Sequence, residues 1–400
     1  QGADVVIMDE EYIPMLEGAL DNRPVFIAWH DSEPEDLPFP TLESLRPGQS
    51  TNEPSKPSRT GRTIILTSGT TGKPKGAARA EPRGIADLLA VVTMIPYRYR
   101  SRVLVSAPLF HTWGFAQFSS NLSFNGTVVL RRRFEPEDVL QTIEREKIDM
   151  WGVVPVMLQR LLDLPDDVKK KYDVSSLRAV TASGSALPGE LATEFMDEFG
   201  DVLYNLYGST EVAWATVATP RDMRDAPGTA GRVPTGTVVK VLDDDGEEVP
   251  TGTTGQVFVK HDMVFEGYTG GEQKNQCADM AGTGDLGHMD SDGRLFIDGR
   301  IDEMIVSGGE NVYPIEVEDV IVKHEAVHEA AVIGVEDDQF GERLKAFVVP
   351  ANGSKPTEDA LKDHVKSHLA RFKVPREVVF LDELPRNATG KILKRELRKL

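Results

Sequence analysis

The sequence is poor in cysteine, in basic relative to acidic residues, and in long apolar runs. Its 400 residues include one cysteine, Cys277, which excludes an intrachain disulfide and argues against cysteine-rich zinc modules. Lys and Arg total 45 against 64 Asp and Glu, and a chain with a formal net charge of −19 repels the phosphate backbone of a nucleic acid. The apolar stretch Ile85–Pro96 is interrupted by Asp87 and is too short to span a bilayer. We therefore expect neither a nucleic-acid partner nor a transmembrane segment.

The overall composition and length are those of a globular protein with more than one domain. Hydrophobic residues make up 40% and charged residues 27%, which separates the chain from disordered acidic tails. Four hundred residues also exceed what one hydrophobic core usually serves. No secretory pattern opens the sequence at Gln1–Asp4, so we expect a cytoplasmic protein. Peripheral contact with a membrane and formation of a homodimer are left open.

Strands and helices alternate through the first half of the chain. Apolar runs bounded by turn residues predict buried strands, and longer stretches with an apolar stripe predict helices. This alternation predicts an α/β fold with mainly parallel sheets. The predicted strands are Val5–Met8, Val25–Ala28, Thr63–Thr67, Val103–Val105, Val128–Leu130, Val153–Val154 and Ala179–Thr181, and the clearest helices are Pro136–Lys147 and Gly189–Phe199.

The pattern changes twice in the second half. Gly and Asp become frequent after Pro220 and short strands dominate, which predicts a β-rich subdomain. Beyond Arg300 a helix is predicted to open near Pro314, and another runs from Thr357. The second helix is predicted to carry Leu361, Val365, Leu369 and Phe372 on one face. We therefore expect a large part with several subdomains over residues 1–300, a boundary at 301–303, and a small α+β domain over 304–400.

A loop rich in Gly, Thr and Lys follows the predicted strand at Thr63–Thr67. Its glycines allow main-chain N–H groups to approach an anion, while its hydroxyls and lysines can bind phosphate oxygens. The spacing is not that of a Walker A loop, and a solvated turn is the alternative. The candidate phosphate-binding residues are Thr67, Ser68, Gly69, Thr70, Thr71, Gly72, Lys73 and Lys75.

Five ordered segments together resemble the signature motifs of the adenylate-forming superfamily, which comprises acyl-CoA synthetases, luciferases and peptide-synthetase adenylation domains. They are Thr67–Gly76, Tyr207–Glu211, Gly282–Gly287, Gly299–Asn311 and Pro385–Ile392. The resemblance extends from about Thr63 onward. Members of that superfamily carry a longer region ahead of the phosphate loop than the 62 residues present here, so we expect the chain to lack part of it.

The resemblance implies a two-step ligase reaction. A carboxylate attacks the α-phosphorus of ATP to give an acyl-adenylate and pyrophosphate, and a thiol then displaces AMP. The implied cofactors are ATP, Mg²⁺ and CoA. We expect an ATP-dependent carboxylic acid–CoA ligase with a fatty acid as the acid. The alternatives are a fatty acyl-AMP ligase, an aryl-acid–CoA ligase, and a binding protein that keeps the fold without the activity.

The resemblance also implies roles for the nucleotide site. Lys391 would lie between the carboxylate and the α-phosphate, although it also belongs to a basic run, Arg386–Lys399, that a solvated tail would explain. Glu211 would bind Mg²⁺, because carboxylate oxygens suit that ion, and an exposed glutamate is the alternative. Tyr207 would contact adenine unless it is an ordinary core residue. The residues predicted for adenine and ribose are Gly184, Ser185, Tyr207, Gly208, Thr210, Asp285 and Arg300.

Three further groups of residues follow from the resemblance. His111 would lie at the mouth of the acyl pocket and act in catalysis, with a packed core histidine as the alternative. Asp302 would be a hinge, and we expect a proline there to retain adenylation and to lose the thiol step. The predicted acyl pocket comprises His111, Trp113, Gly114, Gly184 and Trp214, and the predicted CoA contacts are Ser307, Gly308 and Gly309.

One motif points to a different chemistry. His324-Glu325-Ala326-Val327-His328 matches the H-E-x-x-H pattern of zinc hydrolases, which requires both histidines on one face of a helix. The apolar residues after His328 predict a strand there, which argues against a zinc site. His364 and His368 have the same weak claim on a metal, and we expect both to face solvent.

Overall fold

The computed structural model divides into two compact units, residues 1–61 and 62–400. It describes all residues except 1–2, 17, 21, 51, 53–54, 56–57, 59–63, 69–73, 80–90, 210–211, 262–264, 269–275, 308, 338–340, 352 and 388–389. Of residues 65–68, 74–79 and 265–268 it describes the backbone alone.

The first unit is small and has a core of its own. Strands β1 (Val6–Met8) and β2 (Val25–Ile27) pair in parallel, which confirms both predicted strands. Met8, Val25 and Ile27 are buried between them and the neighbouring turns. A short helix, α1 (Ile13–Leu16), and 3-10 turns at Glu10–Tyr12, Pro34–Asp36 and Glu43–Leu45 complete the unit.

The second unit contains the parallel sheet that the sequence predicts. Its strand order is β10-β9-β8-β7-β5-β6, in which only the β10–β9 pair is antiparallel. Leu104, Trp151 and Val180 on its central strands are fully buried, as expected when helices cover both faces of a parallel sheet. The strands are β5 (Arg102–Val105), β6 (Thr127–Leu130), β7 (Met150–Val153), β8 (Ala179–Ala182), β9 (Leu203–Tyr207) and β10 (Thr216–Ala218).

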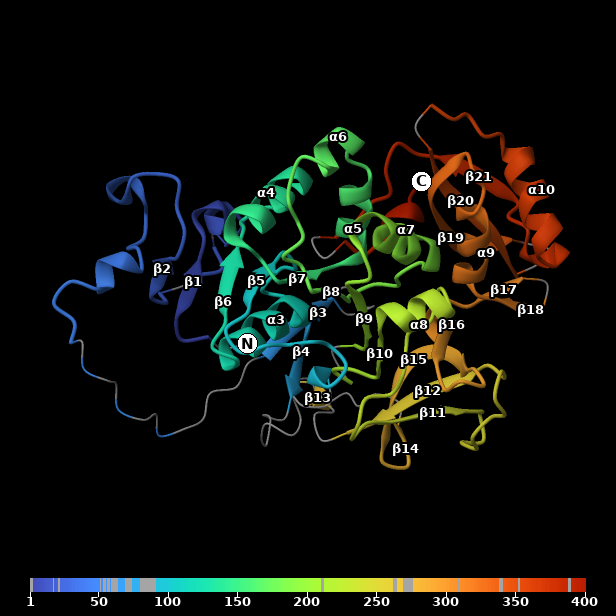
Figure 1. The fold of residues 1–400 in the computed structure, drawn as a ribbon, viewed down its shortest axis with the longest axis horizontal. Coiled ribbons are helices and arrows are strands. Elements are labelled where there is room, and N and C mark those ends of the chain that lie inside the picture. The colour runs from blue at the N-terminus through green and yellow to red at the C-terminus, as the bar shows by residue number, and fades with distance from the viewer. Residues whose placement is uncertain are drawn as a thin grey trace. The chain divides into compact units, whose positions relative to one another are not determined.

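Right-handed crossover connections determine which face of this sheet each helix covers. The chain steps from β6 through β7 and β8 to β9, and α4, α5, α7 and α8 follow one another along one side (Figure 1). The connection from β5 to β6 moves along the sheet in the opposite direction, so a right-handed crossover places its helix, α3, on the other face. Prolines at the first helical position begin α4, α5 and α8. The helices are α3 (Thr112–Ser123), α4 (Pro136–Glu146), α5 (Pro155–Leu162), α6 (Asp166–Lys169), α7 (Gly189–Phe199) and α8 (Pro220–Asp225).

Two antiparallel sheets follow the parallel one. The predicted β-rich subdomain is confirmed as a sheet of order β11-β12-β15-β14, with β16 paired to β15. The second sheet, β13-β4-β3, shows that the predicted phosphate loop joins two antiparallel strands. The strands are β3 (Ile64–Ser68), β4 (Pro74–Arg79), β11 (Val238–Leu242), β12 (Gly255–Lys260), β13 (Phe265–Tyr268), β14 (Gln276–Cys277), β15 (Met280–Met289) and β16 (Leu295–Arg300).

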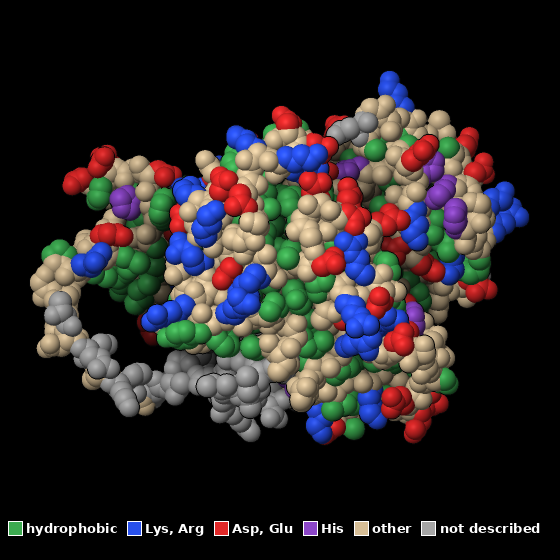
Figure 2. Space-filling model, viewed as in Figure 1, with side chains coloured by type: hydrophobic (Ala, Val, Ile, Leu, Met, Phe, Trp, Pro, Cys, Tyr) green, Lys and Arg blue, Asp and Glu red, His purple; other side chains and the backbone are tan. Residues whose placement is uncertain are grey.

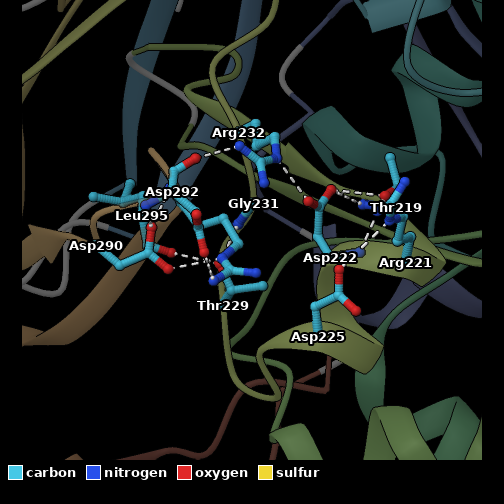
Figure 3. Close-up of polar contacts among 11 residues, drawn as sticks. Thr219, Arg221, Asp222, Asp225, Thr229, Gly231, Arg232, Asp290, Asp292 and Leu295 are labelled. Carbon is cyan, nitrogen blue, oxygen red and sulfur yellow. Dashed lines mark hydrogen bonds and ion pairs between the residues drawn. The ribbon is translucent and has the colours of Figure 1, made fainter.

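A polar cluster fastens the parallel sheet to the β15–β16 hairpin (Figure 3). Thr219 at the start of α8 accepts a hydrogen bond from the N–H of Asp222, and the Asp222 carboxylate accepts from Nε of Arg232 at 2.8 Å. Arg232 also donates to the carbonyl of Asp292, in the turn between the two strands. The buried hydroxyl of Thr229 donates to the Leu295 carbonyl at 2.9 Å. This cluster fixes the relation between strands that carry predicted site residues.

The C-terminal region is a further mixed sheet, with α9 and α10 on one face and α11 on the other. Val332, Ala346 and Val348 pack with α9 and α10, whereas alternate residues such as Ile333 and Phe347 pack with α11 on the other face. Helix α10 ends at His368, so the prediction that Phe372 shares its apolar face is wrong, because Leu369 is already extended. The elements are β17 (Ile305–Ser307), β18 (Glu310–Val312), β19 (Val327–Asp337), β20 (Gly341–Pro350), β21 (Glu377–Phe380), α9 (Pro314–Val322), α10 (Glu358–His368) and α11 (Lys394–Leu397).

The predicted boundary lies at a change of structure. Strand β16 ends at Arg300, and Ile301–Glu303 form a 3-10 turn before β17. The division into domains at 301–303 stays a prediction. On the face drawn in Figure 2, basic and acidic side chains of the described residues are interspersed and do not gather by sign. Among the residues that the structure describes, no helix has the length and apolar character to cross a membrane.

Candidate active site

The first part of the candidate site lies at the carboxyl ends of the strands of the parallel sheet. Strands β8 and β9 pair in parallel, so the segments after Ala182 and after Tyr207 leave the sheet side by side. Gly184 has a φ of +97°, and a Cβ there would lie 3.4 Å from Cγ1 of Val154, just beyond β7. A Cβ on Gly208 would lie 2.3 Å from the Ala213 carbonyl oxygen, so no larger residue fits. Ser185 is exposed beside Gly184.

Tyr207, Asp285 and Arg300 form a connected group. The Tyr207 hydroxyl donates to Oδ2 of Asp285 at 2.5 Å, and Nη1 of Arg300 lies 3.1 Å from Oδ1 of the same carboxylate. Asp285 and Arg300 are cross-strand partners on β15 and β16, which explains why their side chains meet. Burial, and then the negative charge of Asp285, raise the pKa of the Tyr207 phenol well above its ordinary value. The phenol therefore remains a hydrogen-bond donor at neutral pH.

Arg300 links this group to the predicted hinge. Its Nε donates to Oδ1 of Asp302 at 2.8 Å, and Nη2 lies 3.3 Å from Oδ2. Burial opposes the charged guanidinium, but the hydrogen bond to Asp302 and the charge of Asp285 raise the pKa of Arg300 overall. Burial likewise opposes the charged form of Asp302, yet Arg300 lowers the pKa of that carboxyl, with a smaller contribution from the charge of Lys391. Lys391 is thus near enough to Asp302, the predicted hinge residue, for its charge to act on that carboxylate.

Lys391 lies on a tight turn that its neighbours hold in place. Its N–H donates to Oδ1 of Asn387 at 2.9 Å, and its carbonyl accepts from the N–H of Asn387 at 3.0 Å. Arg386 donates to the Gly390 carbonyl at 2.7 Å and to Glu329 on β19 at 2.7 Å. Gly390 has a φ of +79°, which glycine adopts without strain. The turn presents the exposed Lys391 side chain on a fixed backbone.

This turn packs against the edge of the parallel sheet where Gly184 lies. A Cβ on Gly390 would lie 2.5 Å from Cγ1 of Val156 and 3.4 Å from Cγ2 of Val154. Val154 is also the side chain that Gly184 approaches. Gly184 and the Lys391 turn therefore contact the same residue. The structure places the predicted catalytic lysine beside the predicted nucleotide and acyl residues, although more than 200 residues separate them along the chain.

The predicted acyl-pocket residues divide into two sets. His111 caps α3, its Nδ1 accepting from the N–H of Trp113 at 3.3 Å, and the Trp113 indole N–H donates to the Val153 carbonyl at 2.8 Å. A Cβ on Gly114 would lie 2.2 Å from the Pro108 carbonyl oxygen, so α3 begins in close contact with that backbone. Trp214 instead stacks on His261, at 4.5 Å between ring centroids, and its indole donates to Thr237.

The predicted CoA segment forms the hairpin between β17 and β18. Ser307 pairs with Glu310 across the hairpin and with Gly341 at the start of β20. Gly309 has a φ of +88° with open space where a Cβ would lie. Gly308, Gly69, Thr70, Thr71, Gly72, Lys73, Thr210 and Glu211 lie outside the described residues. Thr67, Ser68 and Lys75 lie on β3 and β4, with Thr67 opposite Lys75.

The H-E-x-x-H segment lacks the geometry of a zinc hydrolase. Helix α9 ends at Val322, before His324, while His328 lies on β19 and approaches Asp163 at 3.7 Å. The two histidines therefore do not share a helix face. Among the described residues, no group of three or more His, Cys, Asp or Glu side chains is arranged to hold a metal. His364, which we expected to face solvent, is half-buried and bonds to the Val320 carbonyl.

Several residues that position the site carry no signal in the sequence. Val154 and Val156 read as ordinary apolar residues, yet they contact Gly184 and Gly390. Glu329 is paired with Arg386 across a separation of 57 residues, which no local pattern indicates. Asn387 is the exception, because an asparagine four residues before Lys391 in a segment with Pro and Gly is typical of a side-chain-stabilised turn.

Comparison with known proteins places these features in a family. The family described as AMP-binding enzyme matches residues 1–269, and the family described as AMP-binding enzyme C-terminal domain matches residues 316–391. The chain is 36% identical over 84% of its length to an indoleacetate–CoA ligase of Aromatoleum aromaticum, of which it covers 66%. It is also 36% identical over 84% of its length to a feruloyl-CoA synthase of Amycolatopsis sp, of which it covers 69%. The chain thus spans about two thirds of the length of these relatives.

A solved structure extends the likeness to the fold. The O-succinylbenzoate coenzyme A synthetase of Bacillus subtilis, in complex with ATP and a magnesium ion, superposes with a TM-score of 0.79. The two sequences are 29% identical, and the match covers 99% of this chain and 79% of the other. The likeness includes the α/β part, the β-rich sheet and the C-terminal region together.

Proposed function

Because the chain belongs to the family of AMP-binding enzymes, we propose that it is an ATP-dependent acid–CoA ligase. In the first half-reaction an oxygen of the substrate carboxylate bonds to the α-phosphorus of ATP, and the bond to pyrophosphate breaks. In the second, the CoA sulfur bonds to the acyl carbon, the thiol proton is lost and AMP leaves. The products are AMP, pyrophosphate and an acyl-CoA thioester.

The contact of the Lys391 turn with Val154 and Val156 is the observation that carries this proposal. Carboxylate and ATP are both anionic, so the first step depends mainly on positioning and on neutralising charge. Lys391 would supply that charge between the two reactants. Asp285 would accept from the ribose hydroxyls, and Tyr207 would offer a ring face to adenine. Arg300 would contact ribose or phosphate while it holds Asp285.

Magnesium would be held by Glu211, as the sequence predicts. One carboxylate with phosphate oxygens and water is a common ligand set for Mg²⁺, and the ion would neutralise charge on the phosphates. The loop between β3 and β4 would bind the same phosphates through Thr67, Ser68, Lys75 and the residues between them. Ser307 and Gly309, with Gly308, would pass the arm of CoA close to the backbone.

For the acid, we propose an aromatic substrate in place of the fatty acid that we expected from the sequence. The relatives from Aromatoleum aromaticum and Amycolatopsis sp act by name on indoleacetate and ferulate, and both are aromatic acids. Trp113 is buried at the start of α3 and bonded to the end of β7, so an aromatic side chain lies beside the sheet edge where Gly184 and the Lys391 turn meet. Aromatic rings pair favourably with one another beyond the area that they bury. A location in the cytoplasm and a homodimeric state stay predictions.

The test is a panel of acids assayed with ATP and Mg²⁺, with and without CoA. Pyrophosphate release and thioester formation are measured separately for indole-3-acetate, ferulate, benzoate, octanoate and palmitate. The proposal predicts pyrophosphate release with aromatic acids and a thioester only when CoA is present. A thioester-free adenylate in the presence of CoA indicates an acyl-AMP ligase. A preference for palmitate contradicts the aromatic substrate, and no pyrophosphate with any acid supports the inactive binding protein.

A further inference from the structure

A second lysine, three residues after Lys391, lies between two carboxylates. Nζ of Lys394, the first residue of α11, is 2.7 Å from Oε2 of Glu303 and 3.1 Å from Oε1 of Glu318. The three side chains are 19%, 28% and 18% exposed, so the group is largely shielded from water. Glu303 ends the 3-10 turn that follows β16, and Glu318 lies on α9. One ammonium group thus joins three segments of the C-terminal region.

The group is anchored to the sheet as well. Glu318 also accepts the N–H of Val332 on β19 at 2.7 Å, so its carboxylate satisfies a backbone donor at the edge of the sheet. Burial raises the pKa of Glu318, while the charge of Lys394 opposes this shift. Burial also works against the charge on Lys394, but Glu318 and Glu303 raise the pKa of that ammonium overall. Lys394 therefore stays charged at neutral pH and holds both partners.

The position of Glu303 gives this contact a consequence for the hinge. Arg300, the last residue of β16, is bonded to Asp285 on the neighbouring strand and so belongs with the β-rich sheet. Glu303 is bonded through Lys394 to α9 and α11 and so belongs with the C-terminal region. Only Ile301 and Asp302 lie between these two anchors. A rotation of the C-terminal region is then confined to the backbone of two residues.

We propose that Lys394 is a positioning residue that ties the Lys391 turn to Glu303. Lys391 then moves together with Glu303, as part of one rigid body, when the hinge rotates. The inference rests on the proposed function, because it assigns a role in the first half-reaction. Lys391 is held on one side by Arg386 and Glu329 and on the other by Lys394 and Glu303. Without the second link, the turn can shift relative to the hinge, and small misplacements of a reacting group are costly to the rate.

The thiol step depends less on this link. The β17–β18 hairpin that carries Ser307 is held by its own pairing with Gly341 and by the bond from the N–H of Val306 to Glu342 at 3.0 Å. None of these contacts involves Lys394. Loss of the link to Glu303 is therefore expected to slow adenylation more than thioester formation.

The decisive variant is Glu303→Gln, because it removes the charge that Lys394 holds at the hinge while Lys394 keeps Glu318 as its partner. Lys394→Met and the double variant complete a double-mutant cycle. Glu396→Gln is the matched control, since Glu396 lies on the same helix and pairs with Lys399 near the surface at 2.6 Å. Each protein is assayed for pyrophosphate release from ATP and acid, and for thioester formation from preformed acyl-adenylate, and its melting temperature is recorded.

We expect Glu303→Gln to lower kcat of adenylation by about tenfold or more, with KM for ATP and the rate of the thiol step changed less than about threefold. Lys394→Met should have an effect at least as large, the double variant should add little, and Glu396→Gln should match the parent. Hydrogen exchange at residues 301–304 should rise in Glu303→Gln at an unchanged melting temperature. Equal losses in both half-reactions, or additive effects in the cycle, overturn the inference. A parent protein that releases no pyrophosphate overturns the proposed function instead, whereas the exchange result tests the link by itself.

Discussion

Arg300 is hydrogen-bonded to Asp302 through two nitrogens, at 2.8 and 3.3 Å, at the point where the β-rich sheet ends and the C-terminal region begins. The same guanidinium holds Asp285, which in turn holds Tyr207. Arg300 therefore connects the candidate nucleotide site to the predicted hinge through hydrogen bonds to Asp285 and Asp302. A change in the predicted hinge should therefore alter the surroundings of Arg300, and a nucleotide bound as proposed would alter those of Asp285.

Proline substitutions distinguish the two hinge positions. Ile301–Glu303 form a 3-10 turn, and Arg300 before it has φ −112° and ψ 139°, which suits a residue that precedes proline. Ile301→Pro is therefore compatible with the described turn and should favour it. We expect this variant to retain adenylation and to slow thioester formation from preformed acyl-adenylate by about tenfold or more. Rapid-quench assays of each half-reaction measure both rates.

Asp302→Pro should have the opposite effect. Proline at the second central position of such a turn forces the preceding residue out of the helical region, so it disfavours the conformation in which the Lys391 turn contacts Val156. This prediction differs from the expectation from the sequence, which was retention of adenylation. We predict a larger loss in adenylation than in the thiol step. Asp302→Ala, which removes the carboxylate without the backbone restriction, separates the two causes, and equal rates for the two variants contradict the backbone argument.

Gly390→Ala tests the packing of the Lys391 turn. The residue has a φ of +79°, and a Cβ would lie 2.5 Å from Val156. We expect adenylation to fall by about tenfold or more, because the turn must move away from the sheet edge. Gly353→Ala is the control, since Gly353 has a φ of +78° and open space around a Cβ. Both variants share the backbone strain, so comparable adenylation rates in the two proteins contradict a role for the contact with Val156.

Asp222 should be important for stability. Its carboxylate is buried and bonded to Thr219 and Arg232 in the cluster that fastens the two sheets (Figure 3). Asp222→Ala is expected to lower the free energy of unfolding by about 2 kcal/mol, because it leaves buried partners unsatisfied. Asp225→Ala removes an exposed pair with Arg221 and should change it by about 0.5 kcal/mol or less. Urea unfolding measures both, and equal effects contradict the account.

The contribution of Asp222 should depend on pH. Burial opposes its charged form, but hydrogen bonds from Thr219 and Arg232 lower the pKa of this carboxyl overall. A carboxyl with a lowered pKa in the folded state contributes stability above its unfolded pKa, and this is lost as the pH falls through the folded value. The stability difference between the parent and Asp222→Asn should therefore be constant near pH 7 and shrink below about pH 3.9. A difference that grows on acidification contradicts the assigned shift.

Local patterns predicted most of the elements, and contacts distant in sequence account for the rest. Helix α7 begins and ends at Gly189 and Phe199 as predicted, because its apolar stripe and its glycine C-cap are local signals. Strand β4 was not predicted, since Pro74–Arg79 carries two basic residues and little apolar character. Helix α10 was extended too far because Leu369 and Phe372 continue its period beyond the point where the chain turns.

In the candidate site, too, the sequence indicated some residues, whereas others are recognisable only from contacts distant in sequence. Tyr207, Asp285, Arg300 and Lys391 are predicted site residues that follow from the resemblance, and the structure connects the first three through hydrogen bonds. What the sequence did not indicate was the support around them. Lys394 reads as one more basic residue in the run from Arg386 to Lys399, and only the fold shows that it holds Glu303, 91 positions earlier in the chain.

We expect Lys391 to act in the first half-reaction only. The most direct test of this role is Lys391→Ala, assayed for acyl-adenylate formation from ATP and an aromatic acid and, separately, for thioester formation from preformed acyl-adenylate and CoA. Lys399→Ala serves as control, because Lys399 is 67% exposed on the same terminal segment. This role of Lys391 predicts that adenylation falls by about 100-fold or more while the thiol step stays within about threefold of the parent. Equal losses in the two half-reactions, or full adenylation without Lys391, contradict it.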